Sequence, residues 1–159
     1  MKNLNVNSKV SPLLQVAEVK LKYISKSQTP NHPRVHNSSD AEKIFRLNWG
    51  DDIELLEEFN VLLLNRANYV KGLLRLSRGG LTGTIADPRV LFATALKSLS
   101  VGIIAAHNHP SGSIKPSSQD IELTKRLKEI GRLHEITLID HLILSPHSDF
   151  YSFADEGML

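Results

Sequence analysis

Apolar and basic positions alternate over residues 18–26, with valine, leucine and tyrosine on one side and lysines on the other. This period of two predicts a half-buried strand, and the lysines favour an edge position. Residues 28–39 contain two prolines among polar neighbours, which predicts a loop. We therefore expect residues 1–37 to form an N-terminal extension and residues 38–159 to form the main domain.

The main domain alternates between helical and strand patterns. Two neighbouring strand segments are separated by a short polar turn, so we expect them to form a hairpin. Helices alternate with strands, which predicts an α/β fold in which a mixed sheet carries flanking helices. The expected helices are 38–47, 87–99 and 117–130, and the expected strands are 54–65, 70–77, 101–106 and 150–153, with one or two further strands over 136–144.

Each expected helix has a start or stop signal. A serine or aspartate at 38–40 can cap the first helix, Asp87 followed by proline can start the second, and Gly131 is expected to end the third. The apolar spacing predicts which side chains face the core. These are Ile44, Phe45 and Leu47 in the first helix, and Val90, Leu91, Ala95 and Leu99 in the second.

The composition is that of an ordinary globular domain. The chain has 159 residues, of which 41% are hydrophobic and 23% are charged, and it contains no cysteine. The lack of cysteine excludes disulfide frameworks, thiolate metal sites and a cysteine nucleophile. No apolar run approaches the ~20 residues that span a bilayer, and the first residues lack the apolar core of a secretory signal. We expect a cytoplasmic protein that does not associate with membranes.

One segment combines the residue types that metal-dependent catalysis uses. An apolar strand leads directly into His107 and His109, and Ser117 and Asp120 follow at the start of the third helix. Alternate residues of an extended chain point the same way, so both imidazoles can face one point beyond the strand end. Asp120 can approach that point from the first helical turn. Two imidazoles and a carboxylate form a three-ligand set for Zn²⁺ that leaves a fourth position for water.

A structural interpretation of the same residues is also open. Many His-x-His pairs bind nothing, and Ser117 and Asp120 match a capping pattern in which the acid also suits the helix dipole. The apolar strand before the pair favours the metal site, because active sites gather at strand ends in such sheets. A metal site predicts that His107, His109 and Asp120 converge within about 5 Å even without metal, since ligand distances are only ~2.0–2.2 Å.

At these residues the sequence resembles a known family. The pattern His-x-His-(x)7-Ser-x-x-Asp is similar to the JAMM motif of JAB/MPN-domain metalloproteases. The strings GTIADPRVLFATAL, AAHNHPSGSIKPSSQDIELTKRL and GRLHEITLIDHLIL resemble the C-terminal domain of RadC-type bacterial proteins, and the resemblance covers about 38–159. It implies a JAB/MPN-like fold with the three-layer architecture also seen in cytidine deaminases.

The resemblance also implies roles for individual residues. The two histidines and Asp120 would hold Zn²⁺, and Ser117 would donate a hydrogen bond to the oxyanion of a tetrahedral intermediate. The family places a glutamate in a Glu-x-Phe pattern before an apolar strand. Glu57 matches that position and would act as the general base, with Glu58 as the alternative. The implied reaction is hydrolysis of a peptide or isopeptide amide by metal-activated water.

A second hypothesis is a binding module associated with DNA repair, for which catalysis is dispensable. RadC-type proteins commonly carry an N-terminal helix-hairpin-helix module, and we expect none in the residues before 38. The net charge is only +2, so any association with DNA or a repair complex should be weak. A nucleobase deaminase fits worse, because it requires His-x-Glu and Pro-Cys-x-x-Cys motifs. The residues that could form a modest basic face are Arg66, Lys71, Arg75 and Arg78.

The remaining polar residues near the motif predict structure more than chemistry. We expect Asn108 and Ser111 to form the turn after the strand, with substrate contact as the alternative, and His141 to be a hydrogen-bonded structural histidine. The sequence does not predict the substrate or the oligomeric state. The other histidines are expected to be exposed: His32, His36, His134 and His147.

Overall fold

A computed structural model describes residues 32–79, 86–147 and 149–159. The expected strand at 18–26 lies outside the described residues. Within the described part of the chain, no helix is both long and apolar enough to cross a membrane.

Five strands form one mixed sheet in the order β2-β1-β3-β4-β5. The β1–β2, β1–β3 and β4–β5 pairs are antiparallel, and β3 and β4 are parallel and joined through helix α3. The strands are β1 Glu58–Leu64, β2 Val70–Arg78, β3 Gly102–Asn108, β4 Thr137–Leu144 and β5 Phe150–Ser152; the helices are α1 Ser38–Asn48, the 3₁₀ helix η2 Asp51–Glu54, α2 Pro88–Lys97 and α3 Ser118–Leu133.

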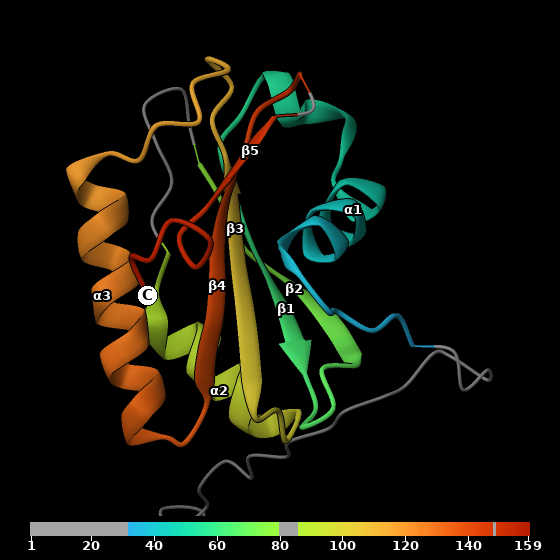
Figure 1. Cartoon of the computed structure of the whole chain (residues 1–159), viewed down its shortest axis with the longest axis vertical. Coiled ribbons are helices and arrows are strands. Elements are labelled where there is room, and N and C mark those ends of the chain that lie inside the picture. The colour runs from blue at the N-terminus through green and yellow to red at the C-terminus, as the bar shows by residue number, and fades with distance from the viewer. Residues whose placement is uncertain (1–31, 80–85, 148) are drawn as a thin grey trace, which may run out of the picture.

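The helices lie on both faces of the sheet and give a three-layer α/β structure (Figure 1). Helices α2 and α3 pack on one face, where Phe59, Leu91 and Leu127 belong to one apolar core. Helix α1 packs on the other face, where Phe45 contributes to a second core. The predicted mixed sheet with flanking helices is confirmed.

The central strands β1 and β3 are buried along their whole length. Their sequences, EFNVLLL and GIIAAHN, are nearly continuous apolar runs because helices cover both faces of these strands. The expected hairpin of β1 and β2 is present. Strand β3 reaches Asn108, two residues beyond the expected end, so it carries His107 within the sheet.

Helix α1 forms where the capping residues predicted it, but its details differ from the expectation. Asn37 is the N-cap, and its side chain accepts a hydrogen bond from the Asp40 amide. Phe45 faces the core as expected, whereas Leu47 is 85% exposed. Two residues correspond to about 200° around a helix, so Leu47 points away from the face that Phe45 occupies.

Helix α2 begins at Pro88 with Asp87 as its N-cap, as predicted. Its buried face contains Leu91, Phe92 and Ala95. The expected inward positions of Val90 and Leu99 are wrong, since their exposed fractions are 49% and 80%. Leu99 lies beyond the end of the helix in a left-handed conformation, with φ of 51°.

Gly131 does not end helix α3, which continues to Leu133. A Cβ atom at position 131 would lie 2.3 Å from the carbonyl oxygen of Ile136. Glycine therefore serves close packing here, and the chain entering β4 returns against the helix at this point.

Candidate metal centre

The His-x-His pair lies where the central strand β3 leaves the sheet. His107 is the penultimate residue of β3 and is buried. His109 follows the strand, and its amide donates to the carbonyl oxygen of Leu144 at 2.9 Å. This bond continues the parallel pairing with β4, so the chain stays extended and both imidazoles lie on one side.

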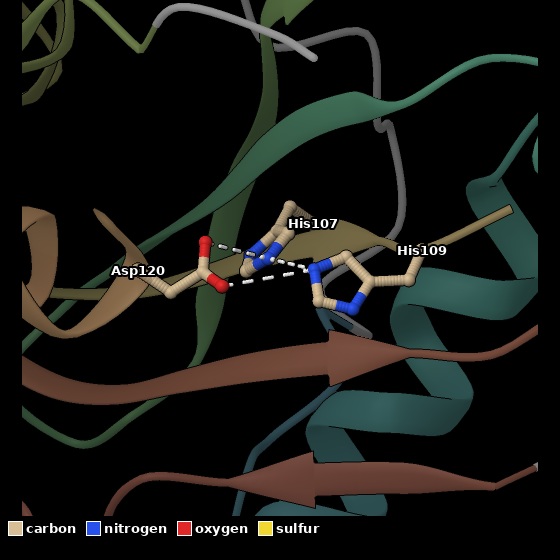
Figure 2. Close-up of side chains that lie close together, drawn as sticks. All are labelled: His107, His109 and Asp120. Atoms are coloured by element: carbon tan, nitrogen blue, oxygen red, sulfur yellow. Dashed lines mark hydrogen bonds and ion pairs between the residues drawn. The ribbon is translucent and has the colours of Figure 1, made fainter. Parts of the chain in front are cut away.

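Asp120 reaches the same point from the first turn of α3 (Figure 2). The Nε2 atoms of His107 and His109 are 3.0 Å apart. One carboxylate oxygen of Asp120 is 3.2 Å from His107 Nε2, and the other is 3.7 Å from His109 Nε2. The ligand atoms of all three lie within 4.8 Å of one another. The expected convergence within about 5 Å is confirmed.

The Asp120 carboxylate also belongs to a capping box at the start of α3. Ser117 is the N-cap, and both its hydroxyl and its amide donate to Asp120 Oδ2, at 2.6 and 2.7 Å. Burial alone would raise the pKa of the Asp120 carboxyl, but His107 and the Ser117 hydrogen bonds lower that pKa well below its usual range. The carboxylate is therefore ionised, and the capping and metal-binding interpretations of the motif are compatible.

The outer nitrogen of each imidazole is hydrogen-bonded to the protein. His109 Nδ1 is 2.6 Å from the carbonyl oxygen of Ser113. A carbonyl only accepts hydrogen bonds, so Nδ1 carries the proton and Nε2 of the neutral ring has a free lone pair. His107 Nδ1 is 2.9 Å from Nε2 of His141. Both rings thus turn their Nε2 atoms toward Asp120.

His141 is buried and hydrogen-bonded, as the sequence predicted, but its partner is a residue of the cluster. Its Nε2 atom contacts His107, and its Nδ1 atom lies 2.6 Å from the hydroxyl of Thr124. Burial holds the pKa of His141 well below the usual value, so this ring is neutral. Thr124 was not predicted from the sequence, although its position one helical turn after Asp120 was a usable signal.

An aromatic side chain supports the buried side of the cluster. The rings of Phe59 and His107 are stacked, with centroids 6.0 Å apart and an angle of 5° between their planes. The two residues are direct partners in the β1–β3 ladder, so they lie on the same face. The Phe59 ring therefore covers one side of the His107 ring and excludes water from it.

The two candidate glutamates differ in their surroundings. Glu58 is buried and is the cross-strand partner of Arg78, whose Nε atom lies 3.3 Å from Glu58 Oε1. Glu57 is half-buried and directly precedes β1, and continued strand alternation would place it on the face of Phe59 and His107. The cluster found among the described residues does not include Glu57.

Asn108 lies in β3 and not in the expected turn. Its fully buried side chain accepts a hydrogen bond from the Glu58 amide and donates to the carbonyls of Ile53 and Leu56. These three bonds fix the segment that leads into β1 and carries Glu57. Exposed Ser111 does lie in the turn.

Much of the expected basic face of the hairpin is used within the molecule. Arg78 pairs with Asp52 and Glu58, and the guanidinium of Arg75 donates to the carbonyl of Asn48. Lys71 donates to backbone carbonyls just after α2. DNA association stays a prediction.

Of the four remaining histidines, His36, His134 and His147 are exposed as expected, and His32 is half-buried.

The chain is similar to a large set of known proteins. A family model described as "RadC-like JAB domain" matches residues 35–158. A "UPF0758 protein" of Alkaliphilus metalliredigens is 36% identical over 154 residues, which are 96% of this chain and 64% of that protein. A "UPF0758 protein" of Porphyromonas gingivalis is 47% identical over 103 residues, covering 65% of this chain and 45% of its own length.

A third "UPF0758 protein", from Flavobacterium johnsoniae, is 44% identical over 102 residues, covering 64% of this chain and 44% of its own length. The chain thus spans about half to two-thirds of the length of these relatives. Their shared name states no activity.

Proposed function

The chain belongs to the family of RadC-like JAB domains, and from this premise we propose that it is a zinc-dependent hydrolase of peptide or isopeptide amide bonds. The observation that carries the proposal is the convergence of His107, His109 and Asp120 within 4.8 Å at the end of β3. Two imidazoles and a carboxylate are the ligand set of catalytic zinc sites, which keep one position open.

The donor set of the cluster fits a metal ion. His109 turns a free lone pair inward because its other nitrogen donates to a backbone carbonyl. The Asp120 carboxylate is ionised. Electron-rich atoms this close repel one another unless a cation, either a proton or a metal ion, lies between them.

The His107 side chain is only 2% exposed, whereas those of His109 and Asp120 are 17% and 14% exposed, so the outer side of the cluster is open to a substrate.

The metal would supply Lewis acidity, which lowers the pKa of a coordinated water to about 7. Glu57 would accept a proton from the attacking water and return it to the leaving amine, as a general base and then a general acid. The Ser117 hydroxyl, at the exposed N-terminus of α3, would donate to the oxyanion. In the present structure that hydroxyl donates to Asp120 Oδ2, so it must exchange partners during the reaction.

A peptide and isopeptide library tests this function. Zinc-loaded wild-type protein should cleave some members, as followed by mass spectrometry, and a chelator should abolish cleavage. Asp120→Ala should be inactive. Asp87→Ala is the matched control, since Asp87 also caps a helix but lies outside the cluster. Absence of cleavage by zinc-loaded wild-type protein across both kinds of bond would argue against the proposal.

The alternative is a binding module for DNA or a repair complex, located like the enzyme in the cytoplasm. Its support is weaker because Arg75 and Arg78 are engaged within the molecule. Phosphate contacts would give binding that weakens with salt, by a log–log slope of about −0.9 per neutralised phosphate. A salt titration with duplex DNA distinguishes the two functions.

A further inference from the structure

We propose that Thr124 and His141 are positioning residues that keep a proton on His107 Nδ1, so that Nε2 is the His107 atom that binds a metal ion. The inference rests on the proposed metal site for its consequence, but the proton on Nδ1 is also a property of the metal-free protein. Three hydrogen bonds carry it: one lies within α3, one joins α3 to β4, and one joins β4 to β3.

The chain of hydrogen bonds starts at a backbone carbonyl. The Thr124 hydroxyl is 2.6 Å from the carbonyl oxygen of Asp120, one helical turn earlier, and 2.6 Å from His141 Nδ1. The hydroxyl has one proton, and the carbonyl can only accept. The Thr124 proton therefore goes to the Asp120 carbonyl. The Thr124 oxygen must then accept, so His141 Nδ1 is the donor.

The assignment passes from His141 to His107. With its proton on Nδ1, the neutral His141 ring has a free lone pair on Nε2, and this atom is 2.9 Å from His107 Nδ1. His107 Nδ1 must therefore carry a proton to make the bond. The Nε2 atom of His107 then faces His109 Nε2 at 3.0 Å and Asp120 Oδ1 at 3.2 Å.

Packing fixes the ring of His141 in the orientation that this relay needs. The residue has no exposed surface, and Thr124 is only 1% exposed. The His141 ring stacks on Phe153, with centroids 5.0 Å apart and an interplanar angle of 9°, and contacts Phe59 at 5.4 Å. Neither water nor a ring flip can readily replace the hydrogen bonds. His107 and Asp120 are thus linked twice, directly and through the backbone of α3.

The test compares Thr124→Val with Thr124→Ser and with Thr94→Val. Valine has nearly the same shape as threonine but no hydroxyl, and serine keeps the hydroxyl. Thr94 is the matched control, because its hydroxyl donates to the carbonyl four residues earlier in α2 at 2.8 Å, outside the cluster. The readouts are the imidazole ¹⁵N shifts of the metal-free protein and the dissociation constant for Zn²⁺ in a chelator competition.

Wild-type protein should show His107 and His141 with protons on Nδ1. In Thr124→Val, His141 has no acceptor for its Nδ1 proton, so that proton should move to Nε2 and His107 should lose its proton on Nδ1. Zn²⁺ should then bind more weakly, by about 10-fold or more, since changes to groups that orient metal ligands typically cost 10–100-fold. Thr124→Ser should restore both properties, and Thr94→Val should change neither.

Two results would overturn the relay. One is a wild-type His107 ring that lacks a proton on Nδ1, and the other is a Thr124→Val protein in which the protons of both rings are unchanged. Unchanged Zn²⁺ affinity despite a tautomer shift would overturn the role of the relay at the metal site. If wild-type protein shows the expected tautomers yet binds no Zn²⁺, the relay is supported and the proposed function fails instead.

Discussion

The Asp120 carboxylate contacts Ser117 and the cluster at the same time: Oδ2 accepts both hydrogen bonds from Ser117 and lies 3.7 Å from His109 Nε2, and Oδ1 lies 3.2 Å from His107 Nε2. The capping box therefore aims the carboxylate at the cluster while it starts helix α3. Ser117 thus affects both the stability of helix α3 and the proposed reaction, and substitutions at position 117 can separate these two effects.

Removal of the Ser117 hydroxyl should reduce amide hydrolysis by about 10²–10³ in kcat, the usual cost of one oxyanion donor. Ser117→Ala should also cost about 0.5–2 kcal/mol of stability through the lost N-cap, whereas Ser117→Gly should cost only a few tenths. Turnover and chemical denaturation of both variants test this. If Ser117→Gly kept its activity, activity would depend on the stability of the helix and not on the hydroxyl. The Ser117 hydroxyl would then act only as the N-cap.

Glu57→Gln should lower turnover by about 10²–10⁴, the typical contribution of a general base, and leave Zn²⁺ affinity unchanged. Glu58→Gln is the matched control, because Glu58 is its neighbour but pairs with Arg78. That change should leave turnover near the wild-type value. The reverse result, with Glu58→Gln inactive and Glu57→Gln active, would assign the base to Glu58.

Asn108→Ala should destabilise the protein by about 2 kcal/mol or more, because it leaves the Glu58 amide and two carbonyls without their buried partner. Hydrogen exchange at the Glu58 amide should accelerate more than exchange in β4. Asn48→Ala is the control, since its amide makes one exposed bond within α1. Equal effects of the two changes would show that Asn108 does not anchor the entry to β1.

Gly131→Ala should destabilise the fold by about 1–3 kcal/mol, the usual cost of overpacking, because the new Cβ would collide with the Ile136 carbonyl. Gly72→Ala is the comparison, since nothing lies within 4 Å of a Cβ there. Thermal or denaturant unfolding measures both. A neutral Gly131→Ala would mean that α3 and the start of β4 can separate without cost.

The sequence predicted those parts of the fold that depend on local pattern. Continuous apolar runs indicated β1 and β3, and Asp87 with Pro88 marked the start of α2. The His107, His109 and Asp120 cluster was also predictable. Its geometry depends only on a strand end, a turn and a helix start that follow one another along the chain.

Contacts between distant segments were not predictable from such patterns. His141 was expected to be structural, and its bond to His107 depends on the parallel register of β3 and β4, in which Ala105 is the partner of His141. A shift of one residue would turn His141 to the other face. Gly131 was misinterpreted for the same reason, because the Ile136 carbonyl that requires glycine comes from the chain returning after the helix.

Elemental analysis of protein purified without chelator tests the metal centre most directly. Wild-type protein and Asp87→Ala should each contain about one zinc per chain, the stoichiometry of a single catalytic site. His107→Ala and Asp120→Ala should contain none. Wild-type protein without zinc, even after reloading, would contradict the metal centre and with it the proposed hydrolysis.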